Sequence, residues 1–172
     1  DRDGNPYVTP EVTTKTLERQ RDVILDHYQE EIASLAGILS QDGDRIDLSK
    51  QIEAQLTEAT EQLPAVAEAA TDQYPNEPYR QQLELIHERL DRVDGPRSGG
   101  YTDADELVAD LEILSEDLRA NNAEAVANEH LDPFIRKVDT FGFTLASLDL
   151  RDHQANHTDA LGEALARQGI DY

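Results

Sequence analysis

The 172-residue chain contains no cysteine, methionine or tryptophan, and its aromatic residues are six tyrosines and three phenylalanines. The absence of cysteine excludes disulfides, thiolate metal sites and thiolate nucleophiles. No apolar run approaches the roughly 20 residues that a membrane-spanning helix needs, and no signal-peptide pattern begins the chain. We therefore expect a cytoplasmic protein without a membrane partner, large enough to bury one core.

Lysine is also scarce, whereas acidic residues are abundant. The chain has 15 basic residues, of which only Lys15, Lys50 and Lys137 are lysines, against 37 acidic residues, so its formal net charge is −22. The acids are spread along every segment, which is typical of the solvated faces of folded helices rather than of an acidic tail. This composition favours a halophilic source, where salt screens self-repulsion. We expect no nucleic-acid partner, because phosphate contacts need a basic surface.

Apolar residues at helical spacing predict helices over most of residues 10–142. Thr9 and Pro10 form the start of the first helix, whose apolar stripe comprises Leu17, Ile24, Tyr28, Ile32, Leu35 and Leu39. It is expected to end near residues 42–43. Further helices are expected from Ser49, around 65–70, over 79–93, from Thr102 to 118 and from 123 to 141. Pro64 either breaks the second helix or starts the third, and Pro133 marks a kink or a missing hydrogen bond.

The apolar period changes after residue 142. Phe143, Leu145, Leu148 and Leu150 form a short apolar run that predicts a buried parallel strand, followed by a helix over about 156–168. Because a parallel strand needs neighbours, this run also indicates a piece of a larger protein. We predict a mainly α fold with long helices and one or a few short strands. Its parts are a motif loop at 1–9, a helical region at 10–142 and a strand–helix unit at 143–172.

The first six residues, Asp-Arg-Asp-Gly-Asn-Pro, crowd charged and amide side chains around a glycine. Gly4 and Asn5 tolerate positive φ, and Pro6 restricts Asn5, so the turn holds its side chains at fixed angles. Such a turn suits an active-site loop, although a charged surface turn has the same residue types. Its position at residue 1 suggests that the chain was cut from a longer one.

Arg151 follows the predicted strand and precedes the last predicted helix, which is where α/β barrels place ligand-binding groups. Its planar guanidinium suits a phosphate or a carboxylate. The alternative is a structural ion pair with Asp149 or Asp152. The segment 94–100 lacks the pattern of a phosphate-binding loop and is expected to be a linker.

His153 and His157 lie four residues apart and share a face if they are helical, a spacing that can bind a metal ion together with Asp149 and Asp152. Histidines at a helix start more often cap the helix or pair with acids. We therefore assign no metal ligand within the chain.

Taken together, the two ends resemble phosphoenolpyruvate carboxylase. That family carries a Gly-Gly-Asp-Arg-Asp-Gly-Asn-Pro-x-Val-Thr stretch, and residues 1–9 begin just inside it. It also carries an Asp-Ile/Leu-Arg-Gln segment at the end of a barrel strand, matched here by residues 149–152, and a following helix with an Ala-Leu-Gly-Glu-Leu-like run, matched by residues 160–164. The resemblance implies an α/β barrel embedded in many helices, and a homotetramer for the whole enzyme.

The resemblance also implies a reaction and a cofactor. Phosphoenolpyruvate and bicarbonate give oxaloacetate and phosphate with Mg²⁺ or Mn²⁺, through carboxyphosphate and CO₂, which the enolate attacks. Arg151 matches an arginine that contacts the substrate phosphate, and Arg2, Asp3 and Asn5 match a motif that orders the same pocket. The family's catalytic His and Lys and its metal ligands are expected outside this chain, which is then inactive alone. Asp152 replaces the usual Gln, which is expected to weaken a hydrogen bond near the pocket.

An alternative interpretation is a non-catalytic, acidic helical module whose long helices mediate assembly. It predicts that the two ends of the chain lie far apart. The enzyme interpretation predicts instead that Arg2 and Arg151 approach each other.

Overall fold

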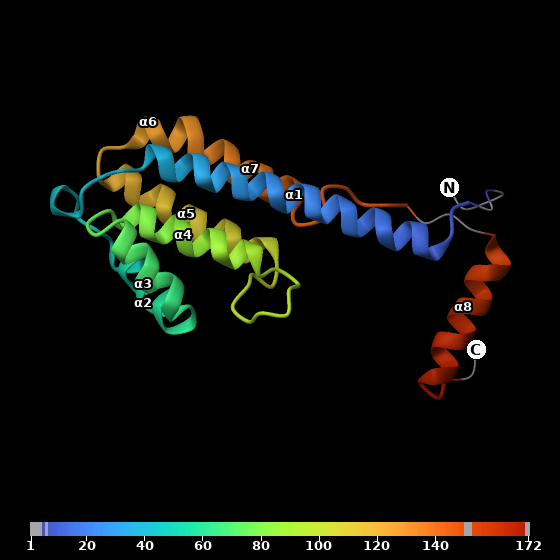
Figure 1. Ribbon diagram of the computed structural model, residues 1–172. Helices are drawn as coiled ribbons and strands as arrows, with labels where there is room; N and C mark the ends of the chain where they lie inside the picture. The colour runs from blue at the N-terminus through green and yellow to red at the C-terminus, as the bar shows by residue number, and fades with distance from the viewer. Residues whose placement is uncertain (1–4, 6, 150–152, 171–172) are drawn as a thin grey trace. The chain divides into compact units, whose positions relative to one another are not determined.

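The computed structural model describes residue 5 and residues 7–149 and 153–170, and these residues are mainly helical with no strand among them (Figure 1). This confirms the predicted mainly α fold. The helices are α1 (Pro10–Ile38), α2 (Lys50–Gln62), α3 (Pro64–Gln73), α4 (Pro78–Asp91), α5 (Ala104–Ala120), α6 (Glu124–Val126), α7 (Asp132–Phe141) and α8 (Gln154–Arg167), with a 3₁₀ turn at Gly43–Arg45 and a π-helical segment at Ala127–Leu131.

Helix starts follow the capping residues of the sequence. The Thr9 hydroxyl accepts a hydrogen bond from the Val12 backbone at 3.4 Å, and the Ser49 hydroxyl accepts one from the Ile52 backbone at 3.3 Å. Each satisfies a first-turn N–H group that has no partner within the helix. Pro64 begins α3, so this proline starts a separate helix. The helix expected from Thr102 begins two residues later, with Asp103 as its cap.

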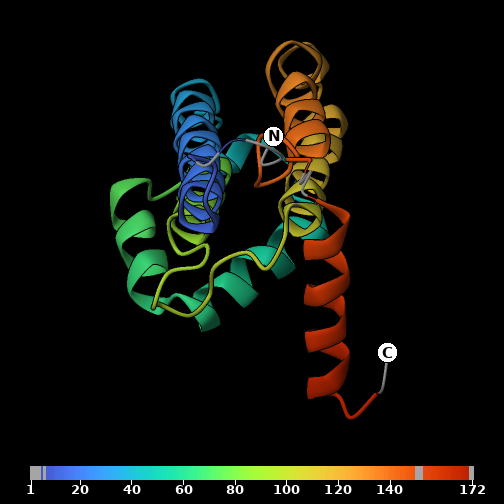
Figure 2. The ribbon, with the colours of Figure 1, turned by 90° about the vertical axis from the view of Figure 1, so that its right-hand side faces the viewer.

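The chain divides into two compact units, one of residues 21–145 and one of residues 1–20 with 146–172. The first unit contains a hydrophobic core to which α1, α2, α4, α5 and α7 contribute, while Ala67 of α3 packs in a smaller cluster with Leu63 and Leu85. Its fully buried members include Tyr28, Leu39, Ile52, Tyr79, Leu83, Leu107, Leu111, Leu114, Leu118, Leu131, Phe134 and Val138. In Figure 2 the line of sight runs roughly along α1, α5 and α7 of this unit.

The predicted stripe of the first helix is buried from Ile24 to Leu39, but Leu17 is 43% exposed. Polar contacts also hold α1 to its neighbours. The Tyr28 hydroxyl donates to the Gly142 carbonyl oxygen at 2.9 Å, and Arg80 Nε of α4 donates to the Ala36 carbonyl oxygen at 2.6 Å. These bonds join α1 to segments far away in sequence.

A buried carboxylate connects α5 to the segment before α2. Asp117 is 2% exposed. Its Oδ1 accepts from the Ser49 backbone N–H at 2.7 Å, and its Oδ2 accepts from the Tyr79 hydroxyl at 2.7 Å and from Asn121 Nδ2 at 3.2 Å. A buried charge is tolerated when hydrogen bonds replace its water, and here both oxygens are bonded. Burial, and then the bond to Asp117, raises the pKa of Tyr79.

The helix expected over 123–141 contains a change of hydrogen-bond register. The π-helical segment precedes Pro133, and the Asp132 N–H donates to the Ala127 carbonyl, five residues back. Pro133 lies in the first turn of α7, directly after the π-helical segment, so its missing N–H falls at the change of register. Gly142 then ends α7 with a φ of 52°, in the left-handed region that favours glycine.

The strand predicted at 143–150 does not form in the described part of it, residues 143–149. The Leu145 N–H donates to the Phe141 carbonyl at 3.1 Å, and Leu145 has a φ of 61°, so the backbone turns instead of extending. Within this chain Phe143 packs into the helical core, while Leu148 is 38% exposed. A parallel strand needs a hydrogen-bonded neighbour, and the described residues offer none.

The helix predicted over 156–168 forms as α8, beginning two residues earlier, and it has no buried residue. Across the part of the chain that the structure describes, we find no helix with the length and apolarity that crossing a membrane requires.

Candidate functional site

Three of the four residues proposed for the substrate pocket, Arg2, Asp3 and Arg151, lie outside the described residues. Their mutual approach therefore stays a prediction. The fourth, Asn5, is exposed and has its own local contacts. Its side-chain oxygen accepts from the Tyr7 N–H at 3.0 Å, and its carbonyl accepts from the Val8 N–H at 3.3 Å. Asn5 thus stabilises the turn that leads into α1, as asparagine commonly does.

The two histidines considered for a metal lie at the start of α8. His153 is the N-cap, and its Nδ1 accepts from the Ala155 N–H at 3.3 Å, while His157 lies exposed one turn later. Capping is the alternative role considered for such a histidine. Within residues 5, 7–149 and 153–170, no three His, Asp or Glu side chains gather as a metal site would require. Asp152 lies outside the described residues.

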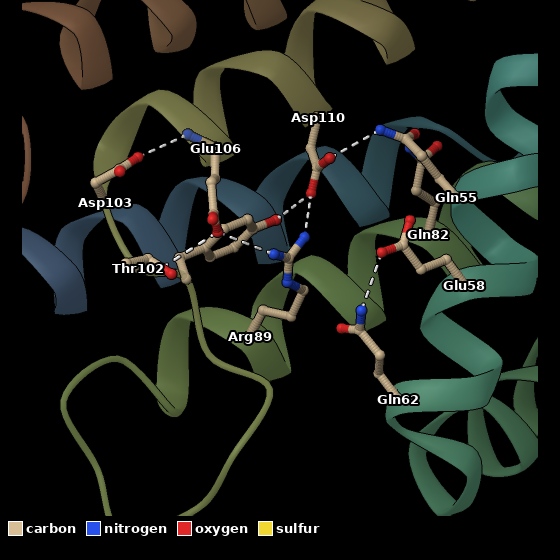
Figure 3. Close-up of polar contacts among 10 residues, drawn as sticks. Gln55, Glu58, Gln62, Gln82, Arg89, Thr102, Asp103, Glu106 and Asp110 are labelled. Atoms are coloured by element: carbon tan, nitrogen blue, oxygen red, sulfur yellow. Dashed lines mark hydrogen bonds and ion pairs between the residues drawn. The ribbon is translucent and has the colours of Figure 1, made fainter.

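A polar cluster within residues 21–145 joins α2, α4 and α5 (Figure 3). Arg89 Nη1 donates to Asp110 Oδ2 at 2.6 Å, and its Nη2 donates to Glu106 Oε2 at 3.2 Å. The same guanidinium lies over the Tyr101 ring, 3.8 Å from its centroid, and the Tyr101 hydroxyl donates to Asp110 Oδ2 at 2.7 Å. A planar guanidinium suits this combination of a stacking contact and two carboxylates.

Burial changes the acid–base behaviour of this cluster. It raises the pKa of Asp110, although the hydrogen bond from Tyr101 and the charge of Arg89 act in the opposite direction. It also raises the pKa of Tyr101 well above its usual range, with the neighbouring Asp110 charge adding to the effect. Both results follow because a low-dielectric site disfavours the charged form of an acid. Tyr101 therefore acts as a hydrogen-bond donor here.

Sequence reasoning missed this cluster. Nothing in the spacing of Arg89 and Asp110 sets them apart from the other polar residues of α4 and α5. The available signal was the position of Tyr101, an aromatic residue between a glycine-rich loop and a helix cap. Its partners lie 12 and 9 residues away along the chain and come together only because α4 and α5 are neighbours.

These observations define a mainly α segment that carries one charged cluster and a capped turn at its start. Its sequence matches the phosphoenolpyruvate carboxylase family over residues 1–172. The chain belongs to the phosphoenolpyruvate carboxylase family.

Individual relatives agree with this assignment. The chain is 33% identical to a phosphoenolpyruvate carboxylase of Roseiflexus castenholzii over 184 residues, covering 99% of this chain and 20% of the relative. It is 34% identical to one of Burkholderia mallei over 193 residues, covering 99% and 18%. It is 37% identical to one of Rhodopseudomonas palustris over 179 residues, covering 96% and 18%. The chain thus spans about a fifth of the length of the curated relatives that it matches.

Proposed function

We propose that the chain is a segment of an enzyme that carboxylates phosphoenolpyruvate with bicarbonate, giving oxaloacetate and phosphate. The observation that carries this proposal is the family match over all 172 residues. The matched range spans residues 1–9 and 149–152, where the two motifs noted in the sequence lie. It favours the enzyme over the alternative of a purely structural assembly module.

Arg151 is proposed to bind the phosphate of phosphoenolpyruvate. A guanidinium offers paired N–H donors in a plane, so it holds a phosphate in one orientation and stabilises the charge that develops on it during transfer. Arg2, Asp3 and Asn5 are proposed to order the same pocket. The turn contacts of Asn5 support a positioning role rather than proton transfer, because its side-chain oxygen already accepts from the Tyr7 N–H.

The remaining parts of the enzyme are proposed to lie outside this chain. Mg²⁺ or Mn²⁺, which would stabilise the anionic enolate and phosphate, needs carboxylate ligands. The described residues present no cluster able to hold such an ion, so we assign none of them to the metal. The catalytic His and Lys are likewise expected elsewhere, and the chain alone is expected to be inactive.

We further propose that the whole enzyme is a cytoplasmic homotetramer from a halophilic, archaeal-type source. The formal charge of −22 and the three lysines support the halophilic origin. We also propose that residues 143–172 act as the strand–helix unit of the barrel when the rest of the enzyme is present. α8 has no buried residue and its Leu161 is 46% exposed, which supports a covering partner for this helix in the longer protein.

The test uses the longer enzyme that contains this segment, with Arg151→Ala. Because a phosphate contact is lost, we expect oxaloacetate formation to fall and the KM for phosphoenolpyruvate to rise by about tenfold or more. Arg151→Lys, which keeps the charge but loses the planar fork, is expected to recover part of the affinity.

Arg136→Ala is the matched control, because Arg136 is exposed on α7 and belongs to neither the proposed pocket nor the strand–helix unit. Unchanged turnover and substrate affinity in Arg151→Ala would refute the role given to Arg151.

A further inference from the structure

A pocket of about 280 Å³ opens between α2, α4 and α5, beside the Arg89 cluster. None of its lining residues belongs to the proposed phosphoenolpyruvate site. Part of its wall is apolar, formed by Leu85, Ile86 and two alanines, Ala59 and Ala109. The remainder is polar, so the pocket has the mixed lining of a small-molecule site.

The charge of the polar wall is negative. Glu58, Glu106 and Asp110 line it, against the single cation of Arg89. Arg89 is already engaged by Glu106 and Asp110. Glu58 has no cationic partner among the described residues, and only Gln62 Nε2 donates to it, at 3.0 Å. Figure 3 shows both Glu58 and Gln62 reaching from α2 toward the side where Arg89 lies.

The side-chain amides of Gln55 and Gln82 form a chain of hydrogen bonds that leads to Asp110. Gln55 Nε2 donates to Asp110 Oδ1 at 2.8 Å. The Gln55 oxygen is then left to accept from Gln82 Nε2, at 2.5 Å. This fixes the orientation of Gln82, which lines the pocket and is 3% exposed. Its Oε1 is buried and receives no hydrogen bond from the described residues.

We propose that this pocket binds a small organic cation, with an ammonium or guanidinium group on a short apolar body. The cation pairs with Glu58, and its N–H groups provide the donor that Gln82 Oε1 lacks. Leaving a buried acceptor without a donor costs free energy that such a ligand would recover. The apolar body covers Leu85 and Ile86. An anionic ligand is excluded by the surplus of carboxylates, and a neutral alcohol loses the pairing with Glu58.

The probe is n-butylammonium, titrated into the full 172-residue chain while backbone amide chemical shifts are followed by NMR. We expect saturable shifts confined to α2, α4 and α5. n-Butanol has a chain of the same length without the charge, and we expect it to bind more weakly by up to about fivefold, which is the most that an exposed charge pair contributes.

Glu58→Gln is expected to weaken butylammonium binding by the same factor of about five, because it removes the unpaired charge and keeps the shape. Glu53→Gln is the control, since Glu53 is exposed on α2 and does not line the pocket. Both positions are exposed, so both variants should fold, and amide spectra verify this directly.

Equal binding of butanol and butylammonium would overturn the proposal. So would unchanged affinity in Glu58→Gln, shifts spread over the whole surface, or an absence of saturable shifts in the folded chain. Binding of K⁺ or Mg²⁺ that butylammonium does not displace would also overturn it, by indicating an inorganic cation.

Discussion

The Tyr28 hydroxyl donates a hydrogen bond to the Gly142 carbonyl oxygen at 2.9 Å, although the two residues lie 114 positions apart in the sequence. Tyr28 is fully buried, and its ring meets Phe134 edge-on with centroids 5.6 Å apart. One side chain thus connects the middle of α1 to the residue that ends α7. Burial raises the pKa of Tyr28 to about 12.

The first prediction concerns Tyr28→Phe. At neutral pH the loss of the hydroxyl hydrogen bond is expected to lower the free energy of unfolding by about 1 kcal/mol. The ordinary pKa of 10.0 describes the unfolded chain, and the folded value is higher. The contribution of neutral Tyr28 is therefore fully present below pH 10 and is lost as the pH rises through 12. Urea titrations across this pH range should show that the difference in unfolding free energy between the original protein and Tyr28→Phe becomes smaller as the pH rises. A difference that stays constant would contradict the raised pKa of Tyr28.

The second prediction concerns Asp117→Asn. The asparagine side chain has only one accepting oxygen, so its NH₂ group would face at least one of the groups that donate hydrogen bonds to Asp117. Because a buried donor then lacks its acceptor, the variant should lose about 3 kcal/mol of unfolding free energy. Glu116→Gln, one residue earlier and exposed, is expected to change it by less than about 0.5 kcal/mol. Denaturant midpoints followed by circular dichroism measure both. Equal effects of the two substitutions would show that Asp117 has no special role.

The third prediction compares two leucines. Leu111 is 0% exposed in the core of residues 21–145, and Leu161 of α8 is 46% exposed. Leu111→Ala should leave a cavity and cost about 3 kcal/mol, whereas Leu161→Ala should cost less than about 0.5 kcal/mol in this chain. Thermal unfolding of the two variants decides the matter. A large loss in Leu161→Ala would mean that α8 is packed against something in solution.

The fourth prediction concerns salt. With a formal charge of −22, the folded chain repels itself, and the range of that repulsion falls from about 10 Å at 0.1 M salt to about 3 Å at 1 M. The unfolding midpoint should rise with KCl. Replacing the exposed Glu61, Glu68 and Glu112 with Gln should raise the unfolding midpoint at low salt and make it depend less on KCl concentration. Replacing the same three residues with Asp should change neither. If the unfolding midpoint changed with KCl in the same way in the Gln and Asp triple variants, charge repulsion would be excluded as the cause of the salt effect.

Much of the helical architecture was predictable, because local chemistry determines it. Ser49 and Pro10 mark helix starts through single hydrogen bonds or a fixed φ, and the apolar stripe from Ile24 to Leu39 follows the helical period. The same reasoning failed at 143–149. There the apolar residues did not reveal that Leu145 adopts a left-handed conformation, which removes the extended geometry that a strand needs.

The site was predictable only in part. The motifs at the two ends indicated the family through their residue order, and the family match supports that indication. The Arg89 cluster depends on α4 lying beside α5, and Asp117 depends on the segment before α2 folding back onto α5. Such contacts between distant residues follow from the packing of whole helices, which a helical period does not specify.

The π-helical segment at Ala127–Leu131 bears on how the length of this chain can vary. An i+5 hydrogen bond encloses one residue more than the i+4 bond of an α-helix. If a single residue were removed from this segment, the segment could become regular α-helix, and the same face of α7 would still point toward the core. Anywhere else in the long helices, a one-residue deletion would rotate all that follows by about 100° and turn the core face toward water. A one-residue deletion is thus expected to be tolerated within this segment and to disrupt the core when it falls on either side of it.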